Sequence, residues 1–118
     1  ADEIHAIHLL EHLHRLSVEP TLKEWFRVLK PGGKLVMELP CLDKIAQMIV
    51  SKEPNIRLTL LGLYGDPRDE RAGMMHQWGW TYHELEWQLR GVGFDNVTFP
   101  EPKFHIPQRD MRVEAVKP

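Results

Sequence analysis

Two histidines and a glutamate near the start of the chain have types and a spacing that could bind a metal ion. His8, Glu11 and His12 spell the pattern H-x-x-E-H, known from inverted zinc motifs. On a helix, His8 and His12 would share one face and could bind Zn²⁺, with Glu84 or Glu86 as a third ligand. Because so short a pattern often matches by chance, we assign no metal ligands and keep this zinc site as an alternative.

The single thiol of the chain, Cys41, is a weaker candidate for a functional residue. Cys41 follows Pro40 at the end of a predicted strand, where it is either a buried thiol or a residue that faces a site. No nearby residue would activate it, so we do not interpret it as a nucleophile. One cysteine cannot form an internal disulfide, which favours a reducing, cytoplasmic environment.

Composition excludes several classes of protein. The chain has 118 residues, of which 42% are hydrophobic and 27% charged, as expected for one folded domain rather than a disordered segment. The formal net charge is −2, so there is no basic excess to bind nucleic acid. Apolar runs are only a few residues long, which predicts neither a membrane span nor a signal segment.

The elements that must position these residues begin with a strand. Partial alternation over 3–7 predicts a short strand, and the His- and Leu-rich stretch 8–17 predicts a loop or an irregular helix. A helix is predicted over 19–29, because Pro20 suits a first turn, where its missing N–H costs nothing. The apolar face of this helix comprises Leu22, Trp25, Phe26 and Leu29.

A sharp turn and a second strand follow. Pro31-Gly32-Gly33 ends the helix and returns the chain to a strand predicted over 34–39. That strand is apolar on both faces, which is typical of a sheet covered on both sides. A helix is predicted over 42–51, ending before Pro54. Its apolar stripe comprises Leu42, Ile45, Ala46 and Ile49.

The second half of the chain contains a long loop. A short helix is predicted over 56–64 and a loop over 65–80, and long loops in compact domains are commonly functional. Thr81 and Glu84 form a capping box that begins a helix running to about Arg90.

Two further strands are predicted over 94–99 and 109–117. Strands separated by helices indicate an α/β fold with parallel pairing, and the final pair of strands indicates one antiparallel member. The large aromatic side chains interpreted as packing residues are Trp25, Phe26, Trp87 and Phe94.

Several segments resemble class I S-adenosylmethionine-dependent methyltransferases. Residues 10–12 (L-E-H) and 22–35 (L-K-E-W-F-R-V-L-K-P-G-G-K-L) are similar to that family's stretch from the end of its fourth strand into its fifth. Residues 76–81 (H-Q-W-G-W-T) and 91–94 (G-V-G-F) resemble the segment before its sixth strand. The resemblance implies an α/β fold: a partial Rossmann-like methyltransferase sheet of strands four to seven, the last antiparallel, with flanking helices.

The family binds S-adenosylmethionine mainly through a glycine-rich turn after its first strand. The G-x-G at residues 91–93 follows a helix and precedes a strand, the reverse of such a turn. The chain also opens on a strand at Ala1, without an initiator Met. We therefore expect residues 1–118 to form a single partial domain that lacks the N-terminal glycine-rich cofactor-binding half, and we expect this chain alone to be inactive.

The resemblance implies a set of site residues at the end of the fourth strand. Ala6, Ile7 and His8 would approach the methionine part of the cofactor, because ligands bind beyond the carboxyl ends of such strands. His12 would face the active-site cavity, where it could position a substrate or accept a proton near neutral pH. Local capping or packing is the alternative role for His12.

Side chains of the long loop are candidates for binding the methyl acceptor. Tyr64, His76 and Trp78, with Asp66 nearby, could form a lid over a substrate. A surface loop anchored by aromatic side chains is the alternative interpretation.

The resemblance predicts methyl transfer from S-adenosylmethionine to a small-molecule or saccharide acceptor. The alternative from another class is a non-catalytic half-domain that assembles through an unpaired strand edge. We expect such an edge at residues 3–7 and, by two-fold antiparallel pairing, a homodimer. Neither nucleic acid nor membrane is an expected partner.

Overall fold

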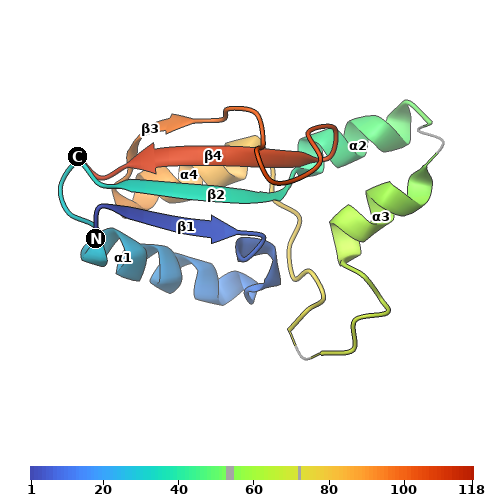
Figure 1. Ribbon diagram of the computed structural model, residues 1–118, viewed down its shortest axis with the longest axis horizontal. Coiled ribbons are helices and arrows are strands. Elements are labelled where there is room, and N and C mark those ends of the chain that lie inside the picture. Colours follow the sequence, from blue (N-terminus) through green and yellow to red (C-terminus); the bar gives the residue numbers. More distant parts are fainter. Residues whose placement is uncertain (53–54, 72) are drawn as a thin grey trace.

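A computed structural model describes residues 1–52, 55–71 and 73–118 as a four-stranded sheet with helices against one face and at one end (Figure 1). No helix within these ranges is both long enough and apolar enough to cross a membrane. The strands are β1 (Glu3–Ile7), β2 (Lys34–Pro40), β3 (Asp95–Thr98) and β4 (Asp110–Val116). The helices are α1 (Val18–Val28), α2 (Leu42–Val50), α3 (Ile56–Tyr64) and α4 (Tyr82–Val92), with short 3₁₀ turns η1 (Leu10–His12) and η2 (Arg15–Ser17).

The sheet has the strand order β1-β2-β4-β3. β1 pairs in parallel with β2, whereas β4 lies antiparallel between β2 and β3. The parallel pair and the antiparallel last strand confirm the predicted α/β class. In Figure 1, both termini lie at one end of the sheet, and α2 and α3 lie beyond the other end, where β1 and β2 finish. The carboxyl ends of the parallel strands β1 and β2 therefore lie at the same end of the sheet as α2 and α3.

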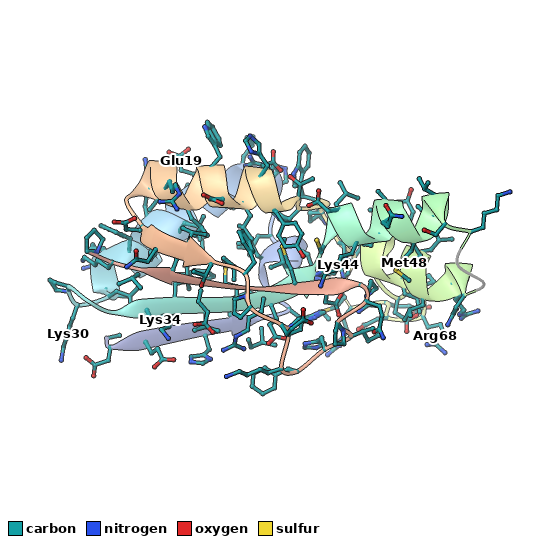
Figure 2. All side chains as sticks on the ribbon, turned by 90° about the horizontal axis from the view of Figure 1, so that it is seen from above. Glu19, Lys30, Lys34, Lys44, Met48 and Arg68 are labelled. Atoms are coloured by element: carbon teal, nitrogen blue, oxygen red, sulfur yellow. The ribbon has the colours of Figure 1, made fainter. Side chains whose placement is uncertain are left out.

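One face of the sheet is apolar and carries the core. Helices α1 and α4 both lie on this face, as Figures 1 and 2 together show. Leu22 of α1 and Leu85 and Leu89 of α4 are fully buried against it. The strand residues in this core are Ala6, Leu35, Met37, Leu39, Met111, Val113 and Ala115. The predicted apolar face of the first helix is thus confirmed, with Trp25 and Phe26 partly buried at its margin.

The opposite face of the sheet carries charged side chains beside the buried Val36, which corrects in part the prediction that β2 is apolar on both faces. Glu38 of β2 accepts a hydrogen bond from Arg112 of β4 at 2.8 Å, and the same guanidinium donates to Glu114 at 2.8 Å. Lys34 pairs with Glu114 at 3.3 Å, and its side chain projects away from α4 in Figure 2. Because Glu38 and Arg112 are both buried, their charges are compensated by each other rather than by water.

The turn between α1 and β2 needs its glycines. Gly32 has a φ of +84°, a conformation that residues with a Cβ rarely adopt. At Gly33, a Cβ atom would lie 2.8 Å from the carbonyl oxygen of Lys30 and 3.1 Å from that of Asp2. The predicted role of Pro31-Gly32-Gly33 as a tight helix-to-strand return is confirmed.

Some local predictions were wrong. Trp87 was expected to pack, but 66% of its surface is exposed, because it lies on the outer side of α4. Ala46 and Ile49 of the expected stripe on α2 are exposed as well, and the predicted stop at Pro54 lies outside the described residues. Only half of the capping box forms: Thr81 accepts from the N–H of Glu84, while the Glu84 carboxylate accepts from the Trp78 indole instead.

The buried Glu38 carboxylate makes fold stability depend on pH. Burial alone would raise the pKa of Glu38, but hydrogen bonds from the N–H of Lys103, from the Arg112 guanidinium and from the N–H of Phe104 hold that pKa below its usual value. A lowered folded-state pKa adds stability above the ordinary carboxyl range, and this stability is lost as the pH falls through the folded pKa.

We therefore expect Glu38→Gln to lower the free energy of unfolding by about 3–5 kcal/mol at pH 7, because it leaves Arg112 buried without its charge partner. The loss should be smaller at acidic pH, for example near pH 3, because Glu38 of the unsubstituted protein becomes protonated as the pH falls through its lowered folded pKa. Urea unfolding at the two pH values measures both. An equal loss at both pH values would show that the carboxylate charge plays no part.

Candidate functional site

Several polar residues that do not stabilise the sheet lie together at the carboxyl end of β1. His8 follows the last residue of β1 in a left-handed conformation (φ +52°), and its N–H donates to the carbonyl of Glu38 at 2.7 Å. This turn directs the chain into η1, which carries Glu11 and His12. The long loop after α3 returns to the same place, because the N–H of Gln77 donates to the carbonyl of Glu11 at 2.7 Å. Residues far apart in the sequence thus meet at one end of the sheet.

Glu11 is the most unusual residue at this end. It is 1% exposed, and neither of its carboxylate oxygens accepts a hydrogen bond from the part of the chain that is described. Two imidazoles lie near this carboxylate: His8 Nδ1 is 3.1 Å from Oε2, and His12 Nε2 is 4.0 Å from the same oxygen. A buried carboxylate without donors is costly, so this position is a candidate for binding a group.

His12 and His76 stand next to Glu11. Their rings meet edge to face with 4.8 Å between centroids. The Nδ1 of His76 lies 2.8 Å from the carbonyl oxygen of Gly62. Because a carbonyl oxygen only accepts, Nδ1 must carry the proton, and Nε2 keeps its lone pair. Burial lowers the pKa of His76, which favours this neutral form.

A second pair of groups lies on the other side of His8. The rings of His8 and His105 stack with centroids 3.4 Å apart, and His8 Nε2 lies 3.9 Å from the Asp110 carboxylate. Asp110 itself is fully buried and is held by the Arg109 guanidinium at 2.8 Å. His8 thus lies between two carboxylates.

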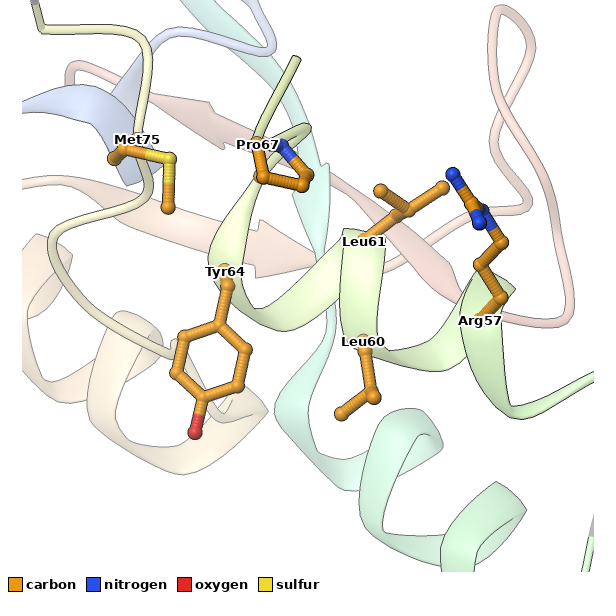
Figure 3. A pocket seen from close by; sticks show the side chains of 7 residues that line it. Arg57, Leu60, Leu61, Tyr64, Pro67 and Met75 are labelled. Carbon is orange, nitrogen blue, oxygen red and sulfur yellow. The ribbon is translucent and has the colours of Figure 1, made fainter. Parts of the chain in front are cut away.

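An apolar pocket of about 470 Å³ opens beside this cluster (Figure 3). Its walls come from α3 and from the loop that follows. Gly65, one of the lining residues, is within contact distance of His76, where an added Cβ would lie 3.2 Å from the ring. The pocket therefore adjoins the cluster through that histidine. Its lining comprises Arg57, Leu60, Leu61, Tyr64, Gly65, Pro67 and Met75.

The residues expected at the cofactor have different exposures. Ala6 packs into the hydrophobic core, whereas Ile7 and His8 beyond it are partly exposed. Of the expected acceptor residues, Tyr64 lines the pocket and His76 adjoins it. Trp78 instead donates to Glu84 at 2.6 Å and stacks on the Arg15 guanidinium, away from the pocket lining.

The zinc site considered from the sequence does not form as written. It required a helix through residues 8–12, but His8 lies in a turn and only 10–12 form a 3₁₀ helix. Glu84 is paired with Arg15 and Trp78, and Glu86 with Arg90. The group of potential ligands within the described residues is Glu11, His12 and His76.

Sequence reasoning singled out Glu11 as a possible metal ligand, but it did not predict the surroundings of this residue, and it missed other residues of the site. Nothing in the local pattern indicated that Glu11 is buried, since its surroundings come from the loop after α3. His105 was not singled out either, although its position between two predicted strands was a usable signal. The apolar residues of α3 were visible as a helical segment, but their role in lining a pocket depends on the fold of the loop that follows.

Cys41 is buried at the start of α2 and takes no part in the cluster. Burial raises the pKa of its thiol, so the thiol stays protonated at neutral pH. This agrees with the expectation that Cys41 is no nucleophile.

Solved structures share this fold at low sequence identity. Human N-acetylserotonin methyltransferase, in complex with S-adenosylmethionine, superposes with a TM-score of 0.65 at 17% identity over 99% of this chain. The methyltransferase SibL in its apo form gives 0.65 at 18% over 99%, and a methyltransferase from Methanosarcina mazei gives 0.62 at 20% over 98%. The chain spans 29%, 31% and 58% of these three proteins, respectively.

At these identities the likeness establishes the fold, a partial Rossmann-like α/β sheet with flanking helices. No curated protein matches the chain by sequence. A family model described as a methyltransferase domain does match, over residues 1–98, which is most of the chain. This protein therefore belongs to the methyltransferase domain family.

Proposed function

We propose that this chain forms the acceptor-facing part of a domain that transfers a methyl group from S-adenosylmethionine to a small molecule. The observation that carries this proposal is the apolar pocket beside a cluster of imidazoles at the carboxyl ends of parallel strands. Ligands of open α/β sheets bind outside these strand ends. Membership of the methyltransferase family supplies the reaction class.

The cofactor lies beyond the end of β1 in this proposal. The side chains of Ile7 and His8 remain partly exposed there and approach its methionine part, while Ala6 contributes backbone. A glycine-rich half of the domain, of the kind that the family resemblance implies, holds the rest of the cofactor. The chain spans between 29% and 58% of the three methyltransferases compared, which is consistent with such a division.

The acceptor occupies the pocket along α3. The pocket is lined mostly by apolar side chains, which favours a small molecule with a hydrophobic body over a saccharide. Arg57 and the hydroxyl of Tyr64 supply polar groups at its margin. The protein's main task in methyl transfer is to align the acceptor with the methyl group. His12, beside His76, is the candidate to orient the acceptor or to accept its proton.

Calorimetric titration with S-adenosylmethionine tests this proposal, performed on the whole protein with the glycine-rich half that the proposal requires. We expect a dissociation constant in the micromolar range, and we expect His8→Ala to weaken binding roughly tenfold or more, which corresponds to about 1.4 kcal/mol.

The matched control for this titration is His5→Ala. His5 lies on β1, the strand that leads to His8, but is exposed and pairs with Glu3, so its replacement should leave the affinity unchanged. The proposal is contradicted if the unsubstituted protein does not bind S-adenosylmethionine, or if both variants bind as tightly as it does.

The edge position of β1 favours a second candidate function, a non-catalytic module that assembles through its sheet. Within the described residues, β1 pairs only with β2, so its other edge is available to a further strand. A second copy could add its own β1 there by two-fold antiparallel pairing.

Light scattering on the full-length protein at micromolar concentration distinguishes the two candidates. The assembly module predicts the mass of a dimer and no affinity for S-adenosylmethionine. A monomer would rule out assembly through β1 and leave methyl transfer as the remaining candidate.

A further inference from the structure

The cluster at the end of β1 contains a set of donor atoms suited to a metal ion. Glu11, His12 and His76 each offer one ligand atom, and these three atoms lie within 4.8 Å of one another. One carboxylate oxygen with two imidazole nitrogens is a ligand set of catalytic zinc sites, which keep a fourth position open. We propose that these three residues bind a divalent transition-metal ion, with Zn²⁺ as the ion that fits them best.

The buried Glu11 carboxylate supports this site independently of the spacing. Its side chain is only 2% exposed, and within the described residues neither oxygen accepts a hydrogen bond of proper geometry, although His8 Nδ1 lies 3.1 Å from Oε2. A neutral partner would leave its charge uncompensated in a region from which water is largely excluded. A divalent cation at this position compensates the negative charge of Glu11 and is coordinated by one of its unpaired carboxylate oxygens.

The orientation of His76 gives the second support. Its Nδ1 donates to the carbonyl of Gly62, which leaves the lone pair of Nε2 free for a ligand. Metal-binding histidines typically donate their other ring N–H to a backbone carbonyl or carboxylate in this manner. The loop that carries His76 is tied to η1 and α3 by backbone bonds from Gln77 to Glu11 and from His76 to Tyr64.

His8 acts outside the ligand set. Its Nδ1 lies 3.1 Å from Glu11 Oε2, beside the carboxylate but without a hydrogen bond to it. Ligand atoms of a tetrahedral zinc site lie roughly 3.3 Å apart, given bonds of about 2.0–2.1 Å. Ion binding must therefore draw the three ligand atoms closer by roughly 1.5 Å at most from their present limit of 4.8 Å.

The open fourth coordination position of the metal could bind the methyl acceptor. This part of the inference rests on the function proposed above. His76 adjoins the apolar pocket through Gly65, so an oxygen or nitrogen atom of a molecule bound there can reach the metal. A metal-bound hydroxyl loses its proton more readily than a free one. The acceptor class is accordingly a small molecule with an apolar body and a hydroxyl or another metal-binding group. Metal binding itself does not depend on methyl transfer.

The test is a calorimetric titration of ZnCl₂ into the full-length protein after removal of metals with a chelator. We expect one Zn²⁺ per chain with a dissociation constant below about 1 μM. Glu11→Gln and His76→Ala should each weaken binding at least 100-fold. His83→Ala is the control, because His83 is exposed on α4 and outside the ligand set, and its affinity should equal that of the unsubstituted protein.

Thermal unfolding without metal checks that the variants fold and provides a second readout. Glu11→Gln keeps the shape of the side chain but removes its buried charge, so this variant should melt at a higher temperature than the metal-free parent while binding zinc more weakly. A metal-free melting temperature that falls in Glu11→Gln would show that the carboxylate already has a protein partner, and would overturn the proposal.

Two titration results would also overturn it: no stoichiometric binding of Zn²⁺, or binding that Glu11→Gln and His76→Ala leave unchanged. Failure of the proposed methyl transfer is separate, because it appears as absent binding of S-adenosylmethionine in a protein that still binds zinc.

Discussion

A buried carboxylate is the constraint around which the site is arranged. Glu11 enters the interior because the loop after α3 closes over η1 and fixes it through the bond from Gln77 to its carbonyl. Burial removes the carboxylate from water. Within the described residues, no donor makes a hydrogen bond to it in place of water. The imidazoles of His8, His12 and His76 surround this charge, so the electrostatics of the site follow from one residue.

The two faces of the sheet stabilise the fold, whereas the candidate site lies at the carboxyl end of its strand β1. Its apolar face packs against α1 and α4, and its opposite face is held by the buried pair of Glu38 and Arg112. Glu38 also accepts hydrogen bonds from the backbone of residues 103–104, which brings the segment with His105 over the end of β1. The same buried pair that stabilises the sheet therefore also helps to position His8.

The elements of the fold were largely predictable from local patterns, but the site was not. The helix ending at Pro31-Gly32-Gly33 and the strand after it follow from turn chemistry and apolar spacing, which act over a few residues. The interpretation of β2 as apolar on both faces overlooked Glu38, because its partner Arg112 lies 74 residues later. The ligand set likewise joins residues 11–12 to residue 76 through a long loop whose path no periodic pattern encodes.

The central claim is that Glu11, His12 and His76 form one binding centre at the carboxyl end of β1. Anomalous scattering from crystals of the full-length protein grown with zinc, recorded on both sides of the zinc absorption edge, tests this claim most directly. The account predicts one strong peak per chain, within about 2.0–2.2 Å of one atom from each of the three residues. Crystals that show no peak there, with zinc present elsewhere or absent altogether, would contradict it.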